Sequence, residues 1–189
     1  MLVLIKAVLQ KTGSEYLTDV WPNMEVFFHG GISFEPYRDQ YKALIPSDRM
    51  HYMETYNASE GFFGLQDNPE EHSLLLMIDY SVFYEFIPIN EVGEEHPTVL
   101  PLEAVEVGKN YAMVITTSGG LWRYQIGDTV RFTSLYPHKF VISGRTKNFI
   151  NAFGEELMVD NADKAISRVC RQTGAKVKEY TAAPLFMLD

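Results

Sequence analysis

Cysteine is almost absent from this chain of 189 residues, which contains only Cys170. A single thiol cannot form an intramolecular disulfide, and without a CxxC pair or a Cys/His cluster the sequence offers no zinc site. The five histidines show no metal-ligand spacing either. Cys170 falls in the apolar periodicity of a predicted helix, which predicts a buried, structural thiol.

Positive charge is also scarce, since 16 Lys and Arg stand against 25 Asp and Glu, for a formal net charge of −9. No basic run is present, which argues against nucleic-acid binding. The apolar stretch at residues 1–10 is interrupted by Lys6, lacks a basic leader and a cleavage site, and is too short to span a bilayer. With 46% hydrophobic residues the chain has enough apolar material for a core. We therefore expect a cytoplasmic globular protein without a membrane or nucleic-acid partner.

The first part of the chain predicts an α/β arrangement. The expected elements are a helix ended by Gly13, a helical turn at 16–21, a strand at 24–29, a helix at 34–44 and a strand at 50–55 followed by a turn at 56–61. This order is typical of a βαβ half-sheet, whose loops at the carboxyl ends of the strands form binding sites. The first helix starts without a capping residue, which indicates a chain cut inside an element.

From residue 74 the pattern changes to short strands. They are expected at 74–78, 82–89, 111–117, 121–125, 129–133 and 140–143. Such spacing is typical of an antiparallel meander or barrel. Beyond it, a strand at 149–150, a helix at 160–173 closed by Gly174 and a strand near Ala175 would begin a further α+β unit.

Three short segments have a chemical interest: Tyr-Asn-Ala-Ser-Glu-Gly at 56–61, Gly-Leu-Trp-Arg-Tyr-Gln-Ile-Gly-Asp at 120–128 and Gly-Arg-Thr-Lys-Asn at 144–148. Each alone could be an ordinary turn or hairpin. Their order and spacing resemble the middle and late motifs of the acyl-adenylate-forming superfamily. The segment 120–128, with 19–26 leading to His-Gly-Gly at 29–31, resembles the auxin-responsive acyl acid–amido synthetase family of jasmonate- and auxin-conjugating enzymes and their bacterial relatives.

The resemblance extends over about residues 1–175 and implies a firefly luciferase-like fold of α/β and β-rich parts. Residues 1–145 would be the C-terminal half of the large adenylate-binding domain, with an α/β part at 1–70 and a distorted β-barrel at 71–145. Residues 146–189 would begin the small, mobile C-terminal α+β domain and would be incomplete.

The resemblance also implies a site for the adenosine of ATP. Gly30, Gly31 and Ile32 would lie along the base, where glycine permits close approach of the backbone. Tyr56 would stack on the adenine, a contact worth about 1–3 kcal/mol per base. Asp128 would accept hydrogen bonds from both ribose hydroxyls.

Phosphate chemistry is implied for the neighbouring residues. Ser59 would offer its hydroxyl to the α-phosphate, and Glu60 would bind Mg²⁺, a hard cation that prefers oxygen ligands. Arg145 would reach the ribose or a phosphate. Lys147 would be the hinge about which the small domain turns between adenylation and acyl transfer.

The implied reaction joins a carboxylic acid to an amine or amino acid through an acyl-AMP. The Ser/Thr/Gly-rich phosphate loop of such enzymes has no match, because residues 116–120 come too late and lead into a strand. No catalytic residue can be assigned, and we expect the chain to be an inactive fragment that self-associates through truncated surfaces. Two alternatives remain open: a CoA ligase of the phenylacetate type, and a non-catalytic nucleotide-binding module.

Overall fold

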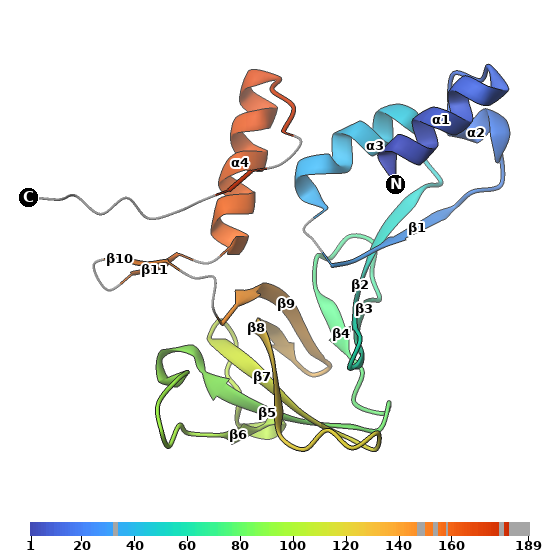
Figure 1. Ribbon diagram of the computed structural model, residues 1–189. Helices are drawn as coiled ribbons and strands as arrows, with labels where there is room; N and C mark the ends of the chain where they lie inside the picture. Colours follow the sequence, from blue (N-terminus) through green and yellow to red (C-terminus); the bar gives the residue numbers. More distant parts are fainter. Residues whose placement is uncertain (32–33, 147–149, 153–154, 158, 178–179, 182–189) are drawn as a thin grey trace, which may run out of the picture.

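The computed structural model describes residues 1–31, 34–146, 150–152, 155–157, 159–177 and 180–181 (Figure 1). The helices are α1 (Leu2–Thr12), α2 (Leu17–Val20), α3 (Arg38–Leu44) and α4 (Val159–Thr173), with 3₁₀ turns η1 (Glu35–Tyr37), η2 (Ile89–Glu91) and η3 (Leu102–Ala104). The strands are β1 (Val26–His29), β2 (His51–Ala58), β3 (Gly61–Gln66), β4 (Leu74–Leu76), β5 (Val82–Pro88), β6 (Leu100–Pro101), β7 (Asn110–Thr117), β8 (Tyr124–Leu135), β9 (His138–Arg145), β10 (Ile150–Ala152) and β11 (Glu155–Leu157).

Both predicted helix ends are confirmed. The N–H of Gly13 donates to the Leu9 carbonyl and that of Gly174 to the Cys170 carbonyl, each at 2.9 Å. Cys170 is only half-buried, contrary to prediction, because α4 packs against η1 and β9 on one side and exposes Val169 on the other. Among the described helices, none has both the length and the apolar character needed to cross a membrane.

Nine strands form one sheet in the order β1-β2-β3-β4-β9-β8-β7-β5-β6, while β10 and β11 pair separately. β1 and β2 are parallel, with α3 in the connection between them, which confirms the predicted βαβ unit. The other pairs of the sheet are antiparallel, as expected from residue 74 onward, and the antiparallel β2–β3 pair extends this arrangement into the predicted α/β part. The sheet therefore continues without a break across residue 70.

Several predicted strand limits were wrong. β2 continues through Ala58, so the turn predicted at 56–61 shrinks to Ser59 and Glu60, and the following strand β3 was not predicted. Segments 121–125 and 129–133 were predicted as two strands, but residues 124–135 form the single strand β8, because Gly127 makes an irregularity within the strand instead of a turn. Residues 175–177 form no strand.

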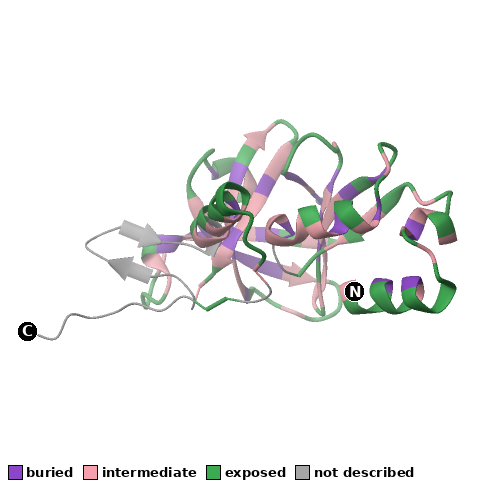
Figure 2. Ribbon diagram, turned by 90° about the horizontal axis from the view of Figure 1, so that it is seen from above, coloured by how far each residue is buried: buried purple, intermediate pink, exposed green. Residues whose placement is uncertain are grey.

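The two larger hydrophobic cores lie on successive parts of the sheet, and buried residues are purple in Figure 2. The first core joins α1, α2, η1 and α3 to β2, and its buried members are Ile5, Leu9, Leu17, Phe34, Tyr41, Ile45, Met50 and Tyr52. The second lies inside the curved β-rich part and is built on aromatic rings, among which Phe63, Phe86 and Phe140 are fully buried. Tyr52 and Tyr56 lie on the same face of β2 but belong to different cores, so this strand connects the two cores.

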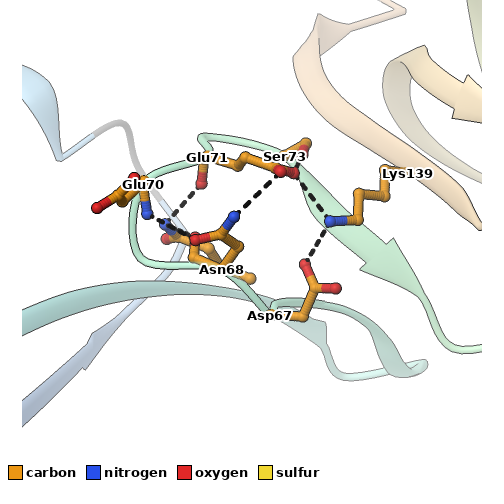
Figure 3. Close-up of polar contacts among 7 residues, drawn as sticks. Asp67, Asn68, Glu70, Glu71, Ser73 and Lys139 are labelled. Atoms are coloured by element: carbon orange, nitrogen blue, oxygen red, sulfur yellow. Dashed lines mark hydrogen bonds and ion pairs between the residues drawn. The ribbon is translucent and has the colours of Figure 1, made fainter.

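An ion-pair network fixes the connection between β3 and β4 against β9 (Figure 3). The Nζ of Lys139 lies 2.8 Å from Glu71 Oε2 and 2.9 Å from Asp67 Oδ1, and its side chain is only 12% exposed. Hydrogen bonds to Glu71 and then Asp67 raise the pKa of Lys139. The Gln66 Nε2 in turn donates to the Glu71 carbonyl at 2.7 Å. The network thus holds β9 in register with β4, three positions from β2 in the sheet.

Candidate functional site

A cavity of about 1480 Å³ lies where the ends of β1, β2, β8 and β9 meet η1 and α4. Six of the predicted site residues line it: Gly30, Gly31, Tyr56, Glu60, Asp128 and Arg145. Ser59 is exposed and is not among the lining residues. Ile32 and Lys147, the remaining predicted positions, lie outside the described residues.

The centre of the site is a hydrogen bond from the Tyr56 hydroxyl to Asp128 Oδ2, 2.6 Å long. Tyr56 is only 5% exposed, and its ring centroid lies 5.2 Å from that of Phe63 and 6.1 Å from that of Phe140. Burial, followed by the negative charge of Asp128, raises the pKa of Tyr56 far above its ordinary range, so the hydroxyl stays a donor. Stacking of Tyr56 on adenine remains a prediction. The sequence analysis did not predict the hydrogen bond from Tyr56 to Asp128.

Arg145 holds the other oxygen of the same carboxylate. Its Nε lies 3.1 Å from Asp128 Oδ1, and the two residues are directly opposite in the β8–β9 ladder. The Asp128 side chain is 17% exposed and that of Arg145 is 59% exposed. Since each carboxylate oxygen can accept a second hydrogen bond, Asp128 is oriented by two donors and can still receive two more.

Local backbone geometry explains why Asp128 reaches the cavity. Gly127 has φ +88°, a conformation that glycine adopts at little cost, and the β7–β8 register shifts beside it. Its carbonyl accepts hydrogen bonds from Thr146, from the backbone N–H at 2.8 Å and from Oγ1 at 3.3 Å. The Gly-Asp pair was predicted as a turn but is an irregularity inside β8, which aims the carboxylate toward β2.

Close packing also fixes the end of β1. A Cβ on Gly30 would lie 2.4 Å from the carbonyl oxygen of Thr55, closer than non-bonded atoms approach. The Thr55 hydroxyl donates to the His29 carbonyl at 3.2 Å. Because residue 30 is glycine, the backbone that follows β1 can pack closely against β2, beside Tyr56.

The cavity continues past Tyr56 to a second group of polar side chains that the sequence analysis missed. Burial raises the pKa of Glu54 to about 7, partly opposed by the charge of Arg38 and reinforced by that of Glu35. Burial, then the charge of Arg38, lowers the pKa of His29 to about 4, while Glu35 acts in the opposite direction. The sequence could have indicated Glu54, because side chains alternate between the two faces of a strand. If Glu54 and Tyr56 belong to one strand, they must share a face.

Glu60 is the residue predicted to bind Mg²⁺. Within the described residues, no group of three His, Cys, Asp or Glu side chains could hold a metal ion. Mg²⁺ in nucleotide enzymes takes only one or two carboxylates and completes its shell with phosphates and water. Glu60, half-buried on the cavity wall, is compatible with such a role.

Family comparisons match the chain in two segments. Residues 2–50 match the GH3 family N-terminal domain, and residues 75–145 match the GH3 family central domain. The chain is 32% identical to indole-3-acetic acid-amido synthetase GH3.4 of Arabidopsis thaliana over 95% of its own length and 32% of that protein. It is also 32% identical to a human GH3 domain-containing protein, over 71% of this chain and 26% of that one. The chain thus spans about a quarter to a third of the length of these curated relatives.

Solved structures agree with the predicted fold. The chain superimposes on the GH3.15 acyl acid amido synthetase with a TM-score of 0.64 and 21% identity, over 89% of this chain and 31% of that one. The AtGH3.15 complex with 2,4-DB gives a TM-score of 0.65 at 19% identity, over 94% and 37% of the two chains. Coronafacic acid ligase from Pectobacterium brasiliense gives 0.50 at 16% identity, over 90% and 32%. The predicted acyl-adenylate-forming fold is confirmed.

Proposed function

This chain belongs to the GH3 family, and we propose that its cavity holds the nucleotide of an ATP-dependent, AMP-forming acyl acid–amido synthetase. In the first step a substrate carboxylate would attack the α-phosphorus of ATP, releasing pyrophosphate and forming an acyl-AMP. In the second step an amine nitrogen would attack the acyl carbon and release AMP. Both steps require the adenosine to be held still, because positioning supplies much of the rate.

The observation that carries the proposal is the oriented Asp128 carboxylate in the cavity. Tyr56 and Arg145 each occupy one lone pair of a different carboxylate oxygen. The remaining lone pairs would accept the two neighbouring ribose hydroxyls, a charge-assisted arrangement. A carboxylate fixed before the ligand arrives loses little freedom on binding.

The other roles follow the family resemblance. Ser59 would contact the α-phosphate and Glu60 would bind Mg²⁺ together with the phosphates. The exposed guanidinium of Arg145 has donors beyond the one given to Asp128, and would reach the ribose or a phosphate. Lys147 would be the hinge between a large domain ending at residue 145 and a small domain that starts at 146.

The names of the relatives suggest substrates. Indole-3-acetic acid, a carboxylic acid with an aromatic ring system, is in the name of one relative, and the AtGH3.15 acyl acid amido synthetase was solved in complex with 2,4-DB. We propose an acid of this class for the first substrate and an amino acid for the acceptor, in a cytoplasmic enzyme.

The test uses the complete gene product that contains residues 1–189. We expect pyrophosphate exchange into ATP that depends on an added aryl carboxylic acid, and amide formation when amino acids are supplied. Asp128→Ala should raise KM for ATP about 10- to 100-fold, since a lost charged acceptor costs about 1.5–3 kcal/mol. Tyr124→Phe is the matched control, because Tyr124 lies on the same strand and is 41% exposed. A lowered melting temperature with unchanged KM for ATP would make Asp128 structural and contradict the proposal.

A further inference from the structure

An acidic side chain lies one step along the strand from the proposed nucleotide site. Residues of β2 alternate between its faces, so Tyr52, Glu54 and Tyr56 share one face. Same-face neighbours on a strand are about 6.6 Å apart, twice the rise per residue. Glu54 and Tyr56 both line the cavity. Glu54 is therefore a neighbour of the group that holds Asp128.

The position of Glu54 is fixed by its backbone. The Glu54 N–H donates to Gln66 Oε1 at 2.8 Å, and Gln66 is 3% exposed. Gln66 is held in turn through its Nε2, which donates to the carbonyls of Asn68 and Glu71 at 3.0 and 2.7 Å. These hydrogen bonds fix the backbone of β2 at Glu54, from which its side chain extends into the cavity.

The Glu54 carboxylate itself lacks a fixed partner. Among the described residues it makes no hydrogen bond or ion pair, although Arg38 is near enough to affect its charge. Arg38 is bound elsewhere: its Nε donates to Glu35 at 2.8 Å, and its guanidinium lies 5.2 Å from the Phe34 ring centroid. His29 stacks on Phe34 at 4.2 Å, and both its ring nitrogens are buried without a partner among the described groups.

Charge in this part of the cavity favours a ligand that brings hydrogen-bond donors. Glu54 would repel the carboxylate of an acyl acid placed beside it, the charge of Glu35 is paired with that of Arg38 2.7 Å away, and neutral His29 adds no positive charge. An amino-acid acceptor has both signs of charge. Its amine suits Glu54, and its carboxylate suits the guanidinium group of Arg171 on α4, which lines the same cavity.

We propose, on the basis of the proposed function, that Glu54 binds the amine of the amino-acid acceptor and takes its proton during acyl transfer. The nitrogen lone pair forms the bond to the carbonyl carbon of the acyl-AMP. The carbon–oxygen bond to AMP breaks, and the electron pair leaves with the phosphate. The proton released from nitrogen passes to the Glu54 carboxylate. A base that titrates near neutral pH is suited to this step, and burial gives Glu54 a pKa of about 7.

The experiment compares the two half-reactions in the complete gene product that contains residues 1–189. The variants are Glu54→Gln and, as a matched control, Glu94→Gln, which changes an exposed glutamate outside the cavity. Acid-dependent pyrophosphate exchange reports the first step, and amide formation from a panel of amino acids reports the second. We expect Glu54→Gln to lower the ratio of amide formation to exchange by about 10²- to 10⁴-fold, the usual range for loss of a general base.

The pH dependence gives a readout that a purely structural role would not change. In the wild-type protein the rate of amide formation should rise through about pH 7, and this rise should be absent in Glu54→Gln. An unchanged ratio, or equal losses in both half-reactions, would overturn the role of Glu54 and leave the proposed function standing. Absence of exchange by the wild-type protein with every aryl and alkyl acid tested would instead remove the proposed function, and this proposal with it.

Discussion

Removing the Tyr56 hydroxyl tests the centre of the site directly. In Tyr56→Phe the ring keeps its contacts with Phe63 and Phe140, so only the 2.6 Å hydrogen bond to Asp128 is lost. Hydrogen bonds to charged groups contribute about 1.5–3 kcal/mol to stability. We expect the free energy of unfolding to fall by about this amount, as measured by urea denaturation of the 189-residue chain. Tyr124→Phe, which alters an exposed ring on β8, should change it by less than about 0.5 kcal/mol.

A double-mutant cycle separates the bond from the general effects of each change. Asp128→Ala leaves the Tyr56 hydroxyl buried without an acceptor, which costs about 1–3 kcal/mol. In the double variant the two losses overlap, so we expect a coupling free energy of at least about 1 kcal/mol. AMP binding, measured by calorimetry, should weaken about 3- to 10-fold in Tyr56→Phe, since Arg145 still orients Asp128. Additive stability losses, with AMP affinity unaffected by Tyr56→Phe, would refute the reasoning.

Three other predictions concern the supports of the site. Gly30→Ala places a Cβ 2.4 Å from a backbone carbonyl of β2 and should lower the free energy of unfolding by about 1–3 kcal/mol; an unchanged urea midpoint would contradict this packing. Lys139→Gln, which removes both ion pairs of the network in Figure 3, should lower the urea midpoint more than Lys109→Gln, which breaks a single exposed pair; equal urea midpoints would show that the network adds nothing to stability. Glu54 has a raised pKa, so its contribution makes the folded state less stable as pH rises from about 4.5 to 7, whereas His29, with a lowered pKa, makes it more stable as pH rises from about 4 to 6.5. In Glu54→Gln the stability measured across this range should therefore rise more steeply with pH than in the wild type, and an identical profile would be inconsistent with a desolvated Glu54.

Elements with local signals were predictable from the sequence. The helix ends at Gly13 and Gly174 depend on the conformation of one glycine each, and the βαβ order follows from the alternation of apolar periods. The extension of β2 through Ala58 was not predictable, because Asn57, Ser59 and Gly61 are turn-forming residues and the strand is held by pairing with β3. A Gly-Asp pair suits a hairpin turn or an irregular strand equally well, and only the neighbouring strands β7 and β9 decide between them.

The candidate site was predicted through motif resemblance, and the fold brings Gly30, Tyr56, Glu60, Asp128 and Arg145 to one cavity. The resemblance supplied residue identities but no side-chain partners. The bond between the tyrosine and the aspartate joins residues 72 positions apart, and no local pattern encodes such a pair. The glutamate two residues before the tyrosine was missed for a related reason, since its burial depends on the packing of η1 and α3 over β2.

The same separation of 72 residues has a consequence for how the chain folds. Hairpins such as β8–β9 close short loops and can form early, whereas joining β2 to the β8–β9 hairpin requires the intervening strands to be in place. Under the proposed function, affinity for AMP would therefore be acquired only when β2 and the β8–β9 hairpin have been joined. A ligand that binds this late-formed arrangement stabilises the assembled chain by mass action and leaves earlier species unaffected. Under the proposed function, nucleotide added during refolding would thus lower the unfolding rate and leave the rate of sheet assembly the same.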